Sequence, residues 1–579
     1  MTVSKMLRAL FLVPLFGLPL FGIAHADSPP AQAVQNALPP HAAIASANSQ
    51  ATDAGIEIIK AGGNAFDAAV AVSATLGLVE PESSGIGGGA FMLLHVAAAD
   101  KQVFIDARER APLAATRDMY LDATGEPMRE SSVNGALAAA IPGLPAGLVH
   151  LAKHYGKLPL AKSLAPAIRL AREGWTFSAK NEMFLGFRRQ VLAVNPAATA
   201  LFLVDGDVPK PGDTLKNPDY AAMLERLAAD GEASFYQGKF AQSLVDGVRA
   251  GGGIWSMQDL ASYRVVERPV LRIEHRGHQI ITVPPPSSGG VALASMLNIM
   301  AGFDYVKLPR VARVHLLTEA MRRAFRDRAL YLGDPDFVDV PVGLLTGSDY
   351  AAGLRAGIHP SKATASAALP GIGDFTERAD TSHFSIIDAE GNLLAMTQTV
   401  NLPFGNAFVV PGSGFLLNNE MDDFSVKPGT PNAYGLVGED ANAIAPGKRP
   451  LSSMTPSFVI GPDRVAVIGT PGGSKIITMV LLGILDLLDG GSAEHAVSLP
   501  RVHHQYLPDA LSAEQGALSE SEIAELQAMG HTISAGERNW GNMQVVVWNK
   551  LSNTVEAGSD PRWKGVGKAS TADESVIFR

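Results

Sequence analysis

The sequence predicts an ordered protein of mixed α and β structure, on three observations. Its 579 residues are 47% hydrophobic and 18% charged, a balance typical of a globular chain with a large core rather than a disordered one. Residues 381–399 alternate apolar and polar side chains around the turn Glu390-Gly391-Asn392, which predicts a hairpin of half-buried strands. Residues 314–332 repeat apolar side chains at helical spacing, which predicts an amphipathic helix.

Charge and cysteine content narrow the functions that the chain can have. The formal net charge is −10 and no long basic block occurs, so nucleic-acid binding is not expected. The chain has no cysteine, which excludes thiol catalysis, disulfides and cysteine-based metal sites. A protein exported without disulfides must be stabilised by its core.

The N-terminus has the features of a secretory signal. Lys5 and Arg8 form a basic region, an apolar run broken by prolines and glycines follows over residues 9–23, and the small-residue site Ala24-His25-Ala26 precedes Asp27. The alternative is a membrane anchor, but the run is too short and too interrupted to span a bilayer. We therefore expect residues 1–26 to be removed, leaving a periplasmic or secreted protein without a stable membrane span.

Two helices are expected after a Pro/Ala-rich lead-in. Thr52–Lys60 favours a helix that ends at Gly62-Gly63. Ala65–Leu78 favours a second helix, for which Asn64 is the N-cap and Asp67 stands in a capping-box position.

A glycine-rich segment, Gly85–Gly89, superficially resembles a dinucleotide-binding loop. It follows a helix and leads into the strand-like residues 91–96, which is the reverse of the order that such a loop requires. We interpret it as a closely packed backbone turn. A further strand is expected to end at residues 104–106 and to direct Arg108 outward.

The centre of the chain, residues 145–370, is predicted to be mostly helical, and residues 363–373 form a loose tether before the hairpin. After the hairpin, residues 427–445 are rich in Gly, Pro and Asn, which predicts a surface loop. The remaining expected elements are strands at residues 457–460, 465–468, 543–548 and 554–557, and a helix at residues 476–488.

Thr381 stands at the head of the first hairpin strand. If the bond between Asp380 and Thr381 were cut, Thr381 would carry both a hydroxyl and a free α-amine, a recognised pairing of nucleophile and base. The pKa of an α-amine, about 7.7–8.0, leaves a useful fraction of free base near neutral pH. A lone strand threonine is more often structural, so this hypothesis needs support from the rest of the chain.

An ordered set of motifs gives that support. Two motifs precede Thr381 and four follow it: Gly85–Gly89, Asp106–Glu109, Thr399–Asn401, Leu417–Phe424, Pro450–Met454 and Gly469–Ser474. With them, from about residue 43 to the C-terminus, the chain resembles the gamma-glutamyltransferase (gamma-glutamyl transpeptidase) family of N-terminal-nucleophile hydrolases, in its bacterial form. The resemblance implies an αββα sandwich, whereas the periodicity alone supports only mixed α/β structure.

The resemblance implies roles for the residues around the nucleophile. Thr381 is expected to be that nucleophile, with Thr399 orienting it. Gly472 and Gly473 open the helix at residues 476–488, and their backbone is expected to form the oxyanion hole.

The resemblance also implies how the donor is held. The α-carboxylate of a γ-glutamyl group is expected at Arg108, Ser452 and Ser453, because a guanidinium and two hydroxyls suit a carboxylate. The α-ammonium of the same group is expected at three further residues, Asn401, Glu420 and Asp423. Tyr434 is expected on a loop that covers the pocket, the alternative being an ordinary surface tyrosine.

Other polar residues near these motifs have structural interpretations. The adjacent acids Asp422 and Asp423 could bind a metal, but their motif contains no histidine. We expect Asp422 to cap local structure, His383 not to act as the base, and Arg110 to lie at the surface. Structural roles are also expected for His503-His504 and Asp560-Pro561-Arg562.

The resemblance therefore implies a self-processing γ-glutamyltransferase and glutathione hydrolase that requires no metal or cofactor. Cleavage after Asp380 would give a large subunit, residues 27–380, and a small catalytic subunit, residues 381–579, intertwined in one domain. Expected substrates are glutathione and other γ-glutamyl compounds, with water, amino acids or peptides as acceptors. Two alternatives stay open: a cephalosporin (glutaryl) acylase of the same family, and an uncleaved periplasmic binding protein.

Overall fold

Two stacked antiparallel β-sheets form the centre of the computed structural model, which describes residues 37–369, 381–537, 539–563, 565–570 and 576–578. The larger sheet has eight strands in the order β19-β18-β1-β9-β10-β2-β3-β6. Their bounds are β1 (Ala43–Ser46), β2 (Gly89–Val96), β3 (Lys101–Ala107), β6 (Val266–Arg268), β9 (Ser382–Ile387), β10 (Leu393–Thr399), β18 (Val566–Ala569) and β19 (Val576–Phe578).

The smaller sheet has six strands in the order β17-β16-β12-β11-β8-β7. Their bounds are β7 (Leu271–His275), β8 (His278–Thr282), β11 (Ser457–Ile460), β12 (Arg464–Gly469), β16 (Gln544–Asn549) and β17 (Thr554–Ser559). Strand β9 packs against β12 and β16 of this sheet, and β10 packs against β12. Two short sheets lie outside the stack: β4 (Trp175–Thr176) with β5 (Thr214–Leu215), and β13 (Val502–His503), β14 (Leu511–Glu514) and β15 (Ile533–Glu537).

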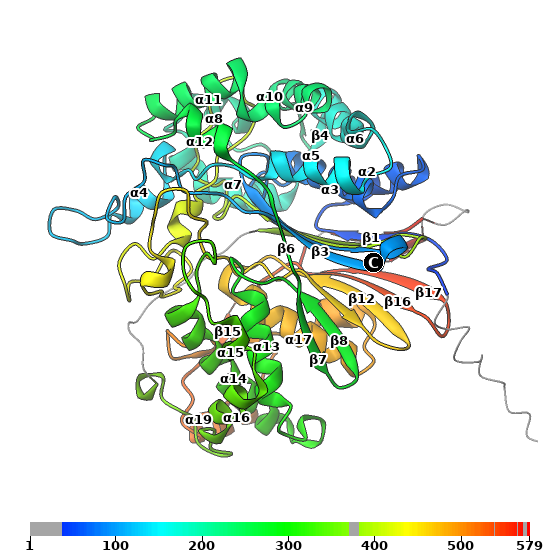
Figure 1. The fold of residues 1–579 in the computed structure, drawn as a ribbon, viewed down its shortest axis with the longest axis vertical. Coiled ribbons are helices and arrows are strands. Elements are labelled where there is room, and N and C mark those ends of the chain that lie inside the picture. The colour runs from blue at the N-terminus through cyan, green and yellow to red at the C-terminus, as the bar shows by residue number, and fades with distance from the viewer. Residues whose placement is uncertain (1–36, 370–380, 538, 564, 571–575, 579) are drawn as a thin grey trace, which may run out of the picture. The chain divides into compact units, whose positions relative to one another are not determined.

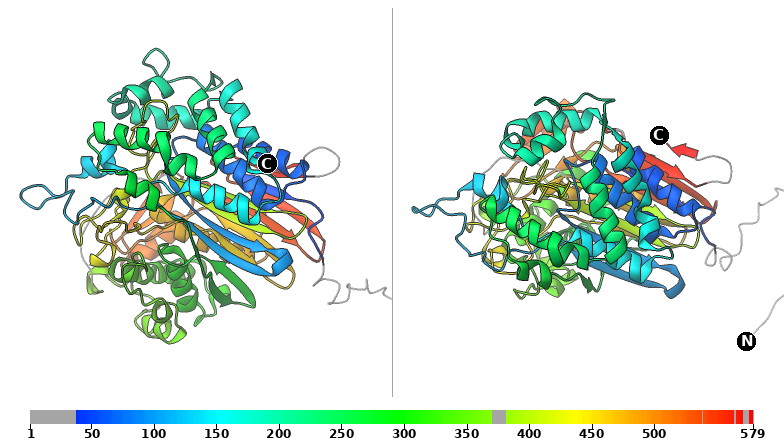
Figure 2. Two further views of the ribbon diagram at one scale, coloured as in Figure 1. Left: turned by 45° about the horizontal axis from the view of Figure 1, so that its top comes forward. Right: turned by 90° about the horizontal axis from the view of Figure 1, so that it is seen from above.

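One layer of helices covers the larger sheet (Figure 1, top). Its bounds are α2 (Ser49–Lys60), α3 (Ala65–Val79), α4 (Arg129–Val133), α5 (Leu144–Tyr155), α6 (Leu160–Glu173), α7 (Ala179–Leu192), α8 (Pro196–Phe202), α9 (Pro218–Asp230), α10 (Ala233–Tyr236), α11 (Gly238–Ala250) and α12 (Met257–Ser262). Helices α2, α3 and α5 contact the sheet directly, and α6 and α9 pack outside them. Seen from above, these helices lie across the strands (Figure 2).

A second layer covers the smaller sheet (Figure 1, bottom). Its bounds are α13 (Gly289–Met300), α14 (Arg310–Tyr331), α15 (Val342–Leu345), α16 (Ser348–Ala356), α17 (Ile476–Leu488), α18 (Ala493–Ser498) and α19 (Glu520–Ala528). Helix α17 packs on β11 and β12, and α14 packs on α13. The chain therefore has the αββα arrangement that the resemblance implies. None of the described helices is long and apolar enough to cross a membrane.

Local signals in the sequence explain where several of these elements begin. The side chain of Asn64 accepts hydrogen bonds from the backbone of α3, and Asp67 completes the capping box, as predicted. In the β9–β10 hairpin, Asp388 accepts from the backbone N–H groups of Glu390 and Asn392 at 2.9 Å each. Gly391 takes the left-handed conformation there, with φ of 85°.

Three expectations about burial are wrong. Strands β9 and β10 are buried on both faces, not half-buried, because one face meets the helices and the other meets the second sheet. Helix α14 is buried along most of its charged face as well as its apolar face, so it is not a surface helix. Residues 427–445 form a loop that is largely buried or half-buried.

The helical centre of the chain also contains strands that the pattern did not indicate. Strands β6, β7 and β8 lie within it, and β7 and β8 form one edge of the smaller sheet. Residues 1–26, the predicted signal, and Asp380, the predicted cleavage residue, lie outside the described residues.

Candidate active site

Thr381 lies immediately before β9, and its side chain is 4% exposed. Its Oγ1 is 3.3 Å from Oγ1 of Thr399, at the end of the neighbouring strand β10. Thr399 Oγ1 also accepts a hydrogen bond of 2.8 Å from the backbone N–H of Asn401. The hairpin register, which pairs Ser382 with Gln398, therefore sets the two threonine hydroxyls side by side.

A small cavity beside Thr381 collects nearly all of the predicted site residues. Its wall is formed by Arg108, Thr381, Thr399, Asn401, Glu420, Asp423, Tyr434, Leu436, Ser452, Ser453, Met454, Gly473 and Ile476. Gly472 lies in the wall of a larger neighbouring cavity. These residues come from segments far apart in the chain, and the fold alone brings them together.

Arg108 is the central cation of this cavity. Its guanidinium donates to Glu420, to Oδ2 of Asp423 at 2.6 Å, and to the carbonyl oxygens of Pro450 and Leu451 at 3.1 and 3.2 Å. The groups expected to read a carboxylate and those expected to read an ammonium are thus paired with each other in the free site. No motif in the sequence indicated this direct pairing.

The carboxyl groups around Arg108 are largely buried, and burial raises the pKa of each of them. Burial raises the pKa of Glu420 and Asp423 above their ordinary range, against the opposing effect of Arg108. Burial likewise raises the pKa of Glu109 to about 7. Oε2 of Glu420 is buried and accepts no hydrogen bond from any described residue. A cation entering the cavity would therefore meet an oxygen that lacks a donor.

Hydrogen bonds to the segment that leads into α13 hold the loop that carries Ser452 and Ser453. Ser452 N donates to the carbonyl oxygen of Pro286 at 2.8 Å, and Ser288 donates to the carbonyl oxygen of Ser452 through both its N–H and its Oγ. Ser452 Oγ accepts from Met454 N at 3.1 Å. The backbone is therefore held while the serine side chains line the cavity.

Asn401 and Tyr434, both in the cavity wall, are hydrogen-bonded to each other. Asn401 has a left-handed backbone, with φ of 76°, and its amide donates to the carbonyl oxygen of Asn419 at 2.8 Å. Tyr434 donates its hydroxyl proton to the carbonyl oxygen of Asn401 at 2.7 Å. Its side chain is 4% exposed, so the alternative of a surface tyrosine is wrong.

Gly472 and Gly473 lie where β12 turns into α17. Both have positive φ, of 139° and 55°, which favours glycine. A Cβ atom on Gly472 would lie 2.5 Å from Cε of Met479. At the start of a helix the backbone N–H groups have no intrahelical acceptor, so they can face an anion.

The glycine segment before β2 is a closely packed turn, as predicted. A Cβ atom on Gly88 would collide with the carbonyl oxygen of Thr399, and one on Gly87 with that of Leu416. Because these glycines have no side chain, the backbone of Thr399, whose hydroxyl lies beside Thr381, can pass close to the turn. That is a positional reason for glycine that the local sequence did not reveal.

The residues given structural interpretations have partners within the fold. Asp422 accepts from Ser132 Oγ and Ala433 N, at 2.8 Å each, and is absent from the cavity wall. Burial lowers the pKa of His383 to about 3, and its ring contacts two hydroxyls, so it is a neutral interior histidine. Arg110 lies outside the cavity as expected, but it is half-buried rather than exposed.

The two predicted C-terminal structural motifs are also hydrogen-bonded within the fold. His503 contacts Thr478 Oγ1 and His504 contacts Asp509, at 2.8 and 3.2 Å. Asp560 accepts from Arg501 at 2.5 Å.

Two charged residues near the cavity were missed. Glu109 follows Arg108 within the motif Asp106–Glu109, and both its carboxylate oxygens are buried without a hydrogen bond from described residues. Arg328 lies on α14, and its guanidinium reaches the hydroxyls of Ser288 and Ser453. In the sequence, Arg328 is marked only as a charged residue on the polar face of an amphipathic helix, a face that normally meets solvent.

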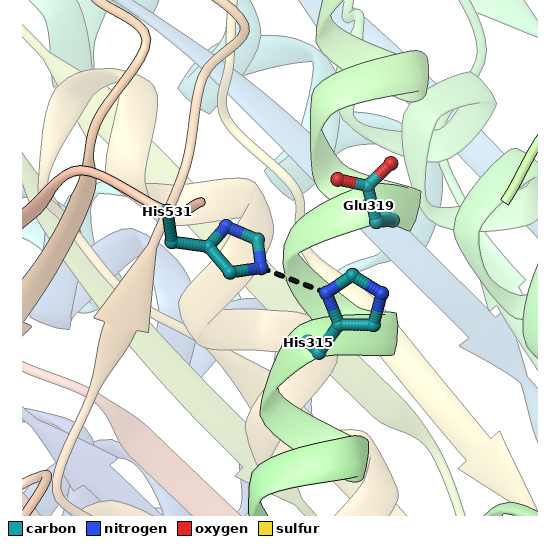
Figure 3. Close-up of side chains that lie close together, drawn as sticks. All are labelled: His315, Glu319 and His531. Atoms are coloured by element: carbon teal, nitrogen blue, oxygen red, sulfur yellow. Dashed lines mark hydrogen bonds between the residues drawn. The ribbon is translucent and has the colours of Figure 1, made fainter. Parts of the chain in front are cut away.

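Among the described residues, one group of histidine and acidic side chains is compact enough to suggest a metal site (Figure 3). Nδ1 of His315 lies 2.7 Å from Nε2 of His531, the two rings meet edge-on, and Glu319 lies one turn along α14. Glu319 already accepts from Arg322 and Arg323. A cation would have to displace these contacts beside two guanidinium groups, so the geometry favours a hydrogen-bonded cluster.

Comparisons with known proteins match most of the chain. The family model described as gamma-glutamyltranspeptidase matches residues 51–570. The glutathione hydrolase proenzyme of Pseudomonas aeruginosa is 42% identical over 534 residues, covering 91% of this chain and 94% of that protein. The glutathione hydrolase proenzyme of Escherichia coli is 40% identical over 525 residues and 90% of each chain. The crystal structure of a cephalosporin acylase from Bacillus halodurans has a TM-score of 0.81, at 27% identity, and covers 94% of this chain and 96% of that one.

Proposed function

The chain belongs to the gamma-glutamyltranspeptidase family, and we propose that it cleaves γ-glutamyl amides such as glutathione through an ester on Thr381. The γ-glutamyl group then passes to water or to the amine of an amino acid or peptide. This makes the chain a γ-glutamyltransferase and glutathione hydrolase. The nucleophile, the base and the oxyanion donors that we propose all come from the chain itself.

The proposal rests on one observation. The wall of a single cavity contains the hydroxyl of Thr381, which lies beside that of Thr399, together with both cationic and anionic side chains. A γ-glutamyl group has an α-carboxylate and an α-ammonium at the end remote from the scissile bond. Arg108 with the two serines offers donors for the first, and Glu420 with Asp423 offers acceptors for the second. Entry of the zwitterion exchanges the internal ion pairs for substrate ion pairs and gives Glu420 Oε2 a donor.

The same hydroxyl performs the proposed self-processing. Oγ1 of Thr381 attacks the carbonyl carbon of Asp380, the C–N bond breaks, and the peptide nitrogen takes up a proton, leaving an ester on Thr381 and a free α-amine. Water then hydrolyses the ester, which releases residues 27–380 and residues 381–579 as separate chains. Before this step Thr381 has no amine, so the precursor should not turn over substrate.

In the mature enzyme the α-amine is the base. It accepts the hydroxyl proton as Oγ1 adds to the γ-carbonyl, and it returns a proton to the departing amine. The developing oxyanion lies against the backbone N–H groups at Gly472 and Gly473. Water or an acceptor amine then attacks the ester. Gly472 lies in the wall of the larger cavity, through which we propose that the leaving group departs and the acceptor enters.

A cephalosporin acylase is the rival activity, since a solved relative bears that name. A glutaryl donor keeps the distal carboxylate but lacks the ammonium. It would leave Glu420 and Asp423 without a cationic partner from the substrate, and the cavity therefore favours the γ-glutamyl donor.

The proposed location rests on the N-terminal sequence. Residues 1–26 have the pattern of a secretory signal, so we place the mature protein in the periplasm or outside the cell.

The experiment is to purify wild type, Thr381→Ala and Thr381→Ser and to examine each by denaturing electrophoresis and mass spectrometry. Wild type should give two chains, one of which begins at Thr381. The alanine variant should stay one chain and be inactive, and the serine variant should retain part of both activities because it keeps a hydroxyl. Normal processing of the alanine variant would contradict the mechanism, and an uncleaved wild type would favour a binding protein.

A further inference from the structure

Arg328 differs from the other buried arginines of the described chain. Six arginines are buried there: Arg108, Arg322, Arg323, Arg328, Arg449 and Arg501. Five of them lie within 4.0 Å of a carboxylate oxygen. Arg328 has no such partner among the described residues. The residue is 5% exposed, so its contact with solvent is small.

The contacts of Arg328 are few and weak for a guanidinium. Nε donates to Ser288 Oγ at 3.0 Å, and an Nη atom is 3.5 Å from Ser453 Oγ, at the long limit of a hydrogen bond. A guanidinium has five N–H donors, and charge-assisted bonds to carboxylates are about 2.7–2.9 Å long. The described residues therefore leave this cation with spare donors and with no carboxylate in direct contact, although the charge of Asp423 acts on it at longer range.

A buried cation without a counter-charge destabilises a fold, so it points to a ligand that completes it. Burial lowers the pKa of Arg328 to about 10, and the charge of Asp423 opposes that effect only in part. At neutral pH the side chain is still a cation. Ser453, which Arg328 touches, belongs to the cavity wall, so an anion at Ser453 would come within reach of the guanidinium.

Arg108 alone does not give the cavity a positive balance. Its guanidinium faces Glu420 and Asp423, with Glu109 close behind at 3.7 Å. A donor carboxylate that approached only Arg108 would add a further negative charge to this group. Arg328 lies on the serine side of the cavity and supplies the missing positive charge there.

We propose that Arg328 is a positioning residue for donor recognition: it contacts Ser453 and supplies a positive charge, not directly paired with a carboxylate, that selects a donor with a free α-carboxylate. This inference rests on the proposed function. Arg328 acts through Ser453 and through its field, so it should affect donor binding far more than the chemical step.

The test compares two donors, γ-glutamyl-p-nitroanilide and its α-carboxamide, which keeps the α-ammonium and the scissile bond but lacks the carboxylate. In Arg328→Gln, kcat/KM for the first donor should fall by about 10- to 100-fold, mainly through KM. For the carboxamide it should change by less than about threefold, because no carboxylate is there to be read. The inhibition constant of L-glutamate should rise in parallel with KM. Arg328→Lys, which keeps the charge, should recover part of the loss.

Arg323→Gln is the matched control. Arg323 is equally buried on the same helix, but it pairs with Glu319 and contacts neither serine. This control should leave the ratio between the two donors unchanged. If Arg328→Gln does not accumulate as processed protein, Arg328→Lys and Ser288→Ala give the same comparison with smaller shifts.

An equal loss on both donors in the Arg328 variants, or the same change of ratio in Arg323→Gln, would overturn this inference and leave the proposed function standing. A wild-type enzyme without turnover of either donor would overturn both.

Discussion

The replacement Asp423→Asn tests how the cavity distinguishes a γ-glutamyl donor from a glutaryl donor. Asp423 accepts from Arg108 at 2.6 Å and faces the cavity. The amide keeps the size of the side chain but removes its charge. A hydrogen bond to a charged group contributes about 1.5–3 kcal/mol, and each 1.36 kcal/mol is about one decade in rate. The specificity constant for the γ-glutamyl donor should therefore fall roughly 10- to 150-fold.

The glutaryl donor should respond differently, because it has no ammonium to lose a partner. The substitution also leaves Arg108 with one fewer carboxylate, so its guanidinium is freer to meet the distal carboxylate that both donors share. We expect the glutaryl specificity constant to be unchanged or to rise.

The neighbouring substitution Asp422→Asn is the matched control. It makes the same chemical change one residue earlier, on a side chain that contacts Ser132 and Ala433 instead of the cavity. Specificity constants for γ-glutamyl- and glutaryl-p-nitroanilide are to be measured on all three enzymes. Equal slowing of both donors by Asp423→Asn would show that Asp423 is structural, and the assignment of the ammonium site would then be wrong.

Three further predictions concern the nucleophile, the oxyanion and pH. Gly473→Val places a branched side chain at a φ of 55°, so kcat should fall about 10²–10³-fold, and a normal rate would locate the oxyanion hole elsewhere. Thr399→Val removes the hydroxyl beside Thr381 and leaves the N–H of Asn401 without its acceptor. Processing and turnover should therefore both slow about tenfold. Thr399→Ser keeps the hydroxyl, so its processing, followed over time on gels, should remain near wild type. Burial raises the pKa of Asp422 from its ordinary 3.8 to about 6, so the folded state retains a proton that the unfolded state has released. Stability should therefore decrease by about 3 kcal/mol as pH rises from about 4 to 6, and thermal unfolding of Asp422→Asn should lack that component.

Local signals predicted the framework of the fold well. The cap at Asn64, the turn at Gly391 and the helix after Gly473 each depend on a few consecutive residues, and each appears in the structure. The family motifs likewise identified the residues that line the cavity, since those motifs mark positions and not only local conformation.

The sequence did not indicate which polar surfaces would be buried by segments distant in the chain. The charged face of α14 looks like a solvent face in the sequence, but Glu319 and Arg322 on that face meet residues such as Thr364 and Asp509, which are far away in the chain. Arg328 was overlooked for this reason. Periodicity reports which side of a helix is apolar, but it does not report whether another layer covers the polar side.

The position of Thr381 explains how the fold could accept a cut in its own centre. Strand β9 begins at the next residue and pairs with β1 on one side and β10 on the other, while β10 pairs with β2. These ladders join the segments before and after the proposed cut through buried backbone hydrogen bonds, which a broken peptide bond at position 380 leaves intact. The hydroxyl therefore keeps its place beside Thr399 while its nitrogen changes from amide to amine. One threonine can then serve first as the nucleophile that cuts the chain and afterwards as the nucleophile that turns over substrate.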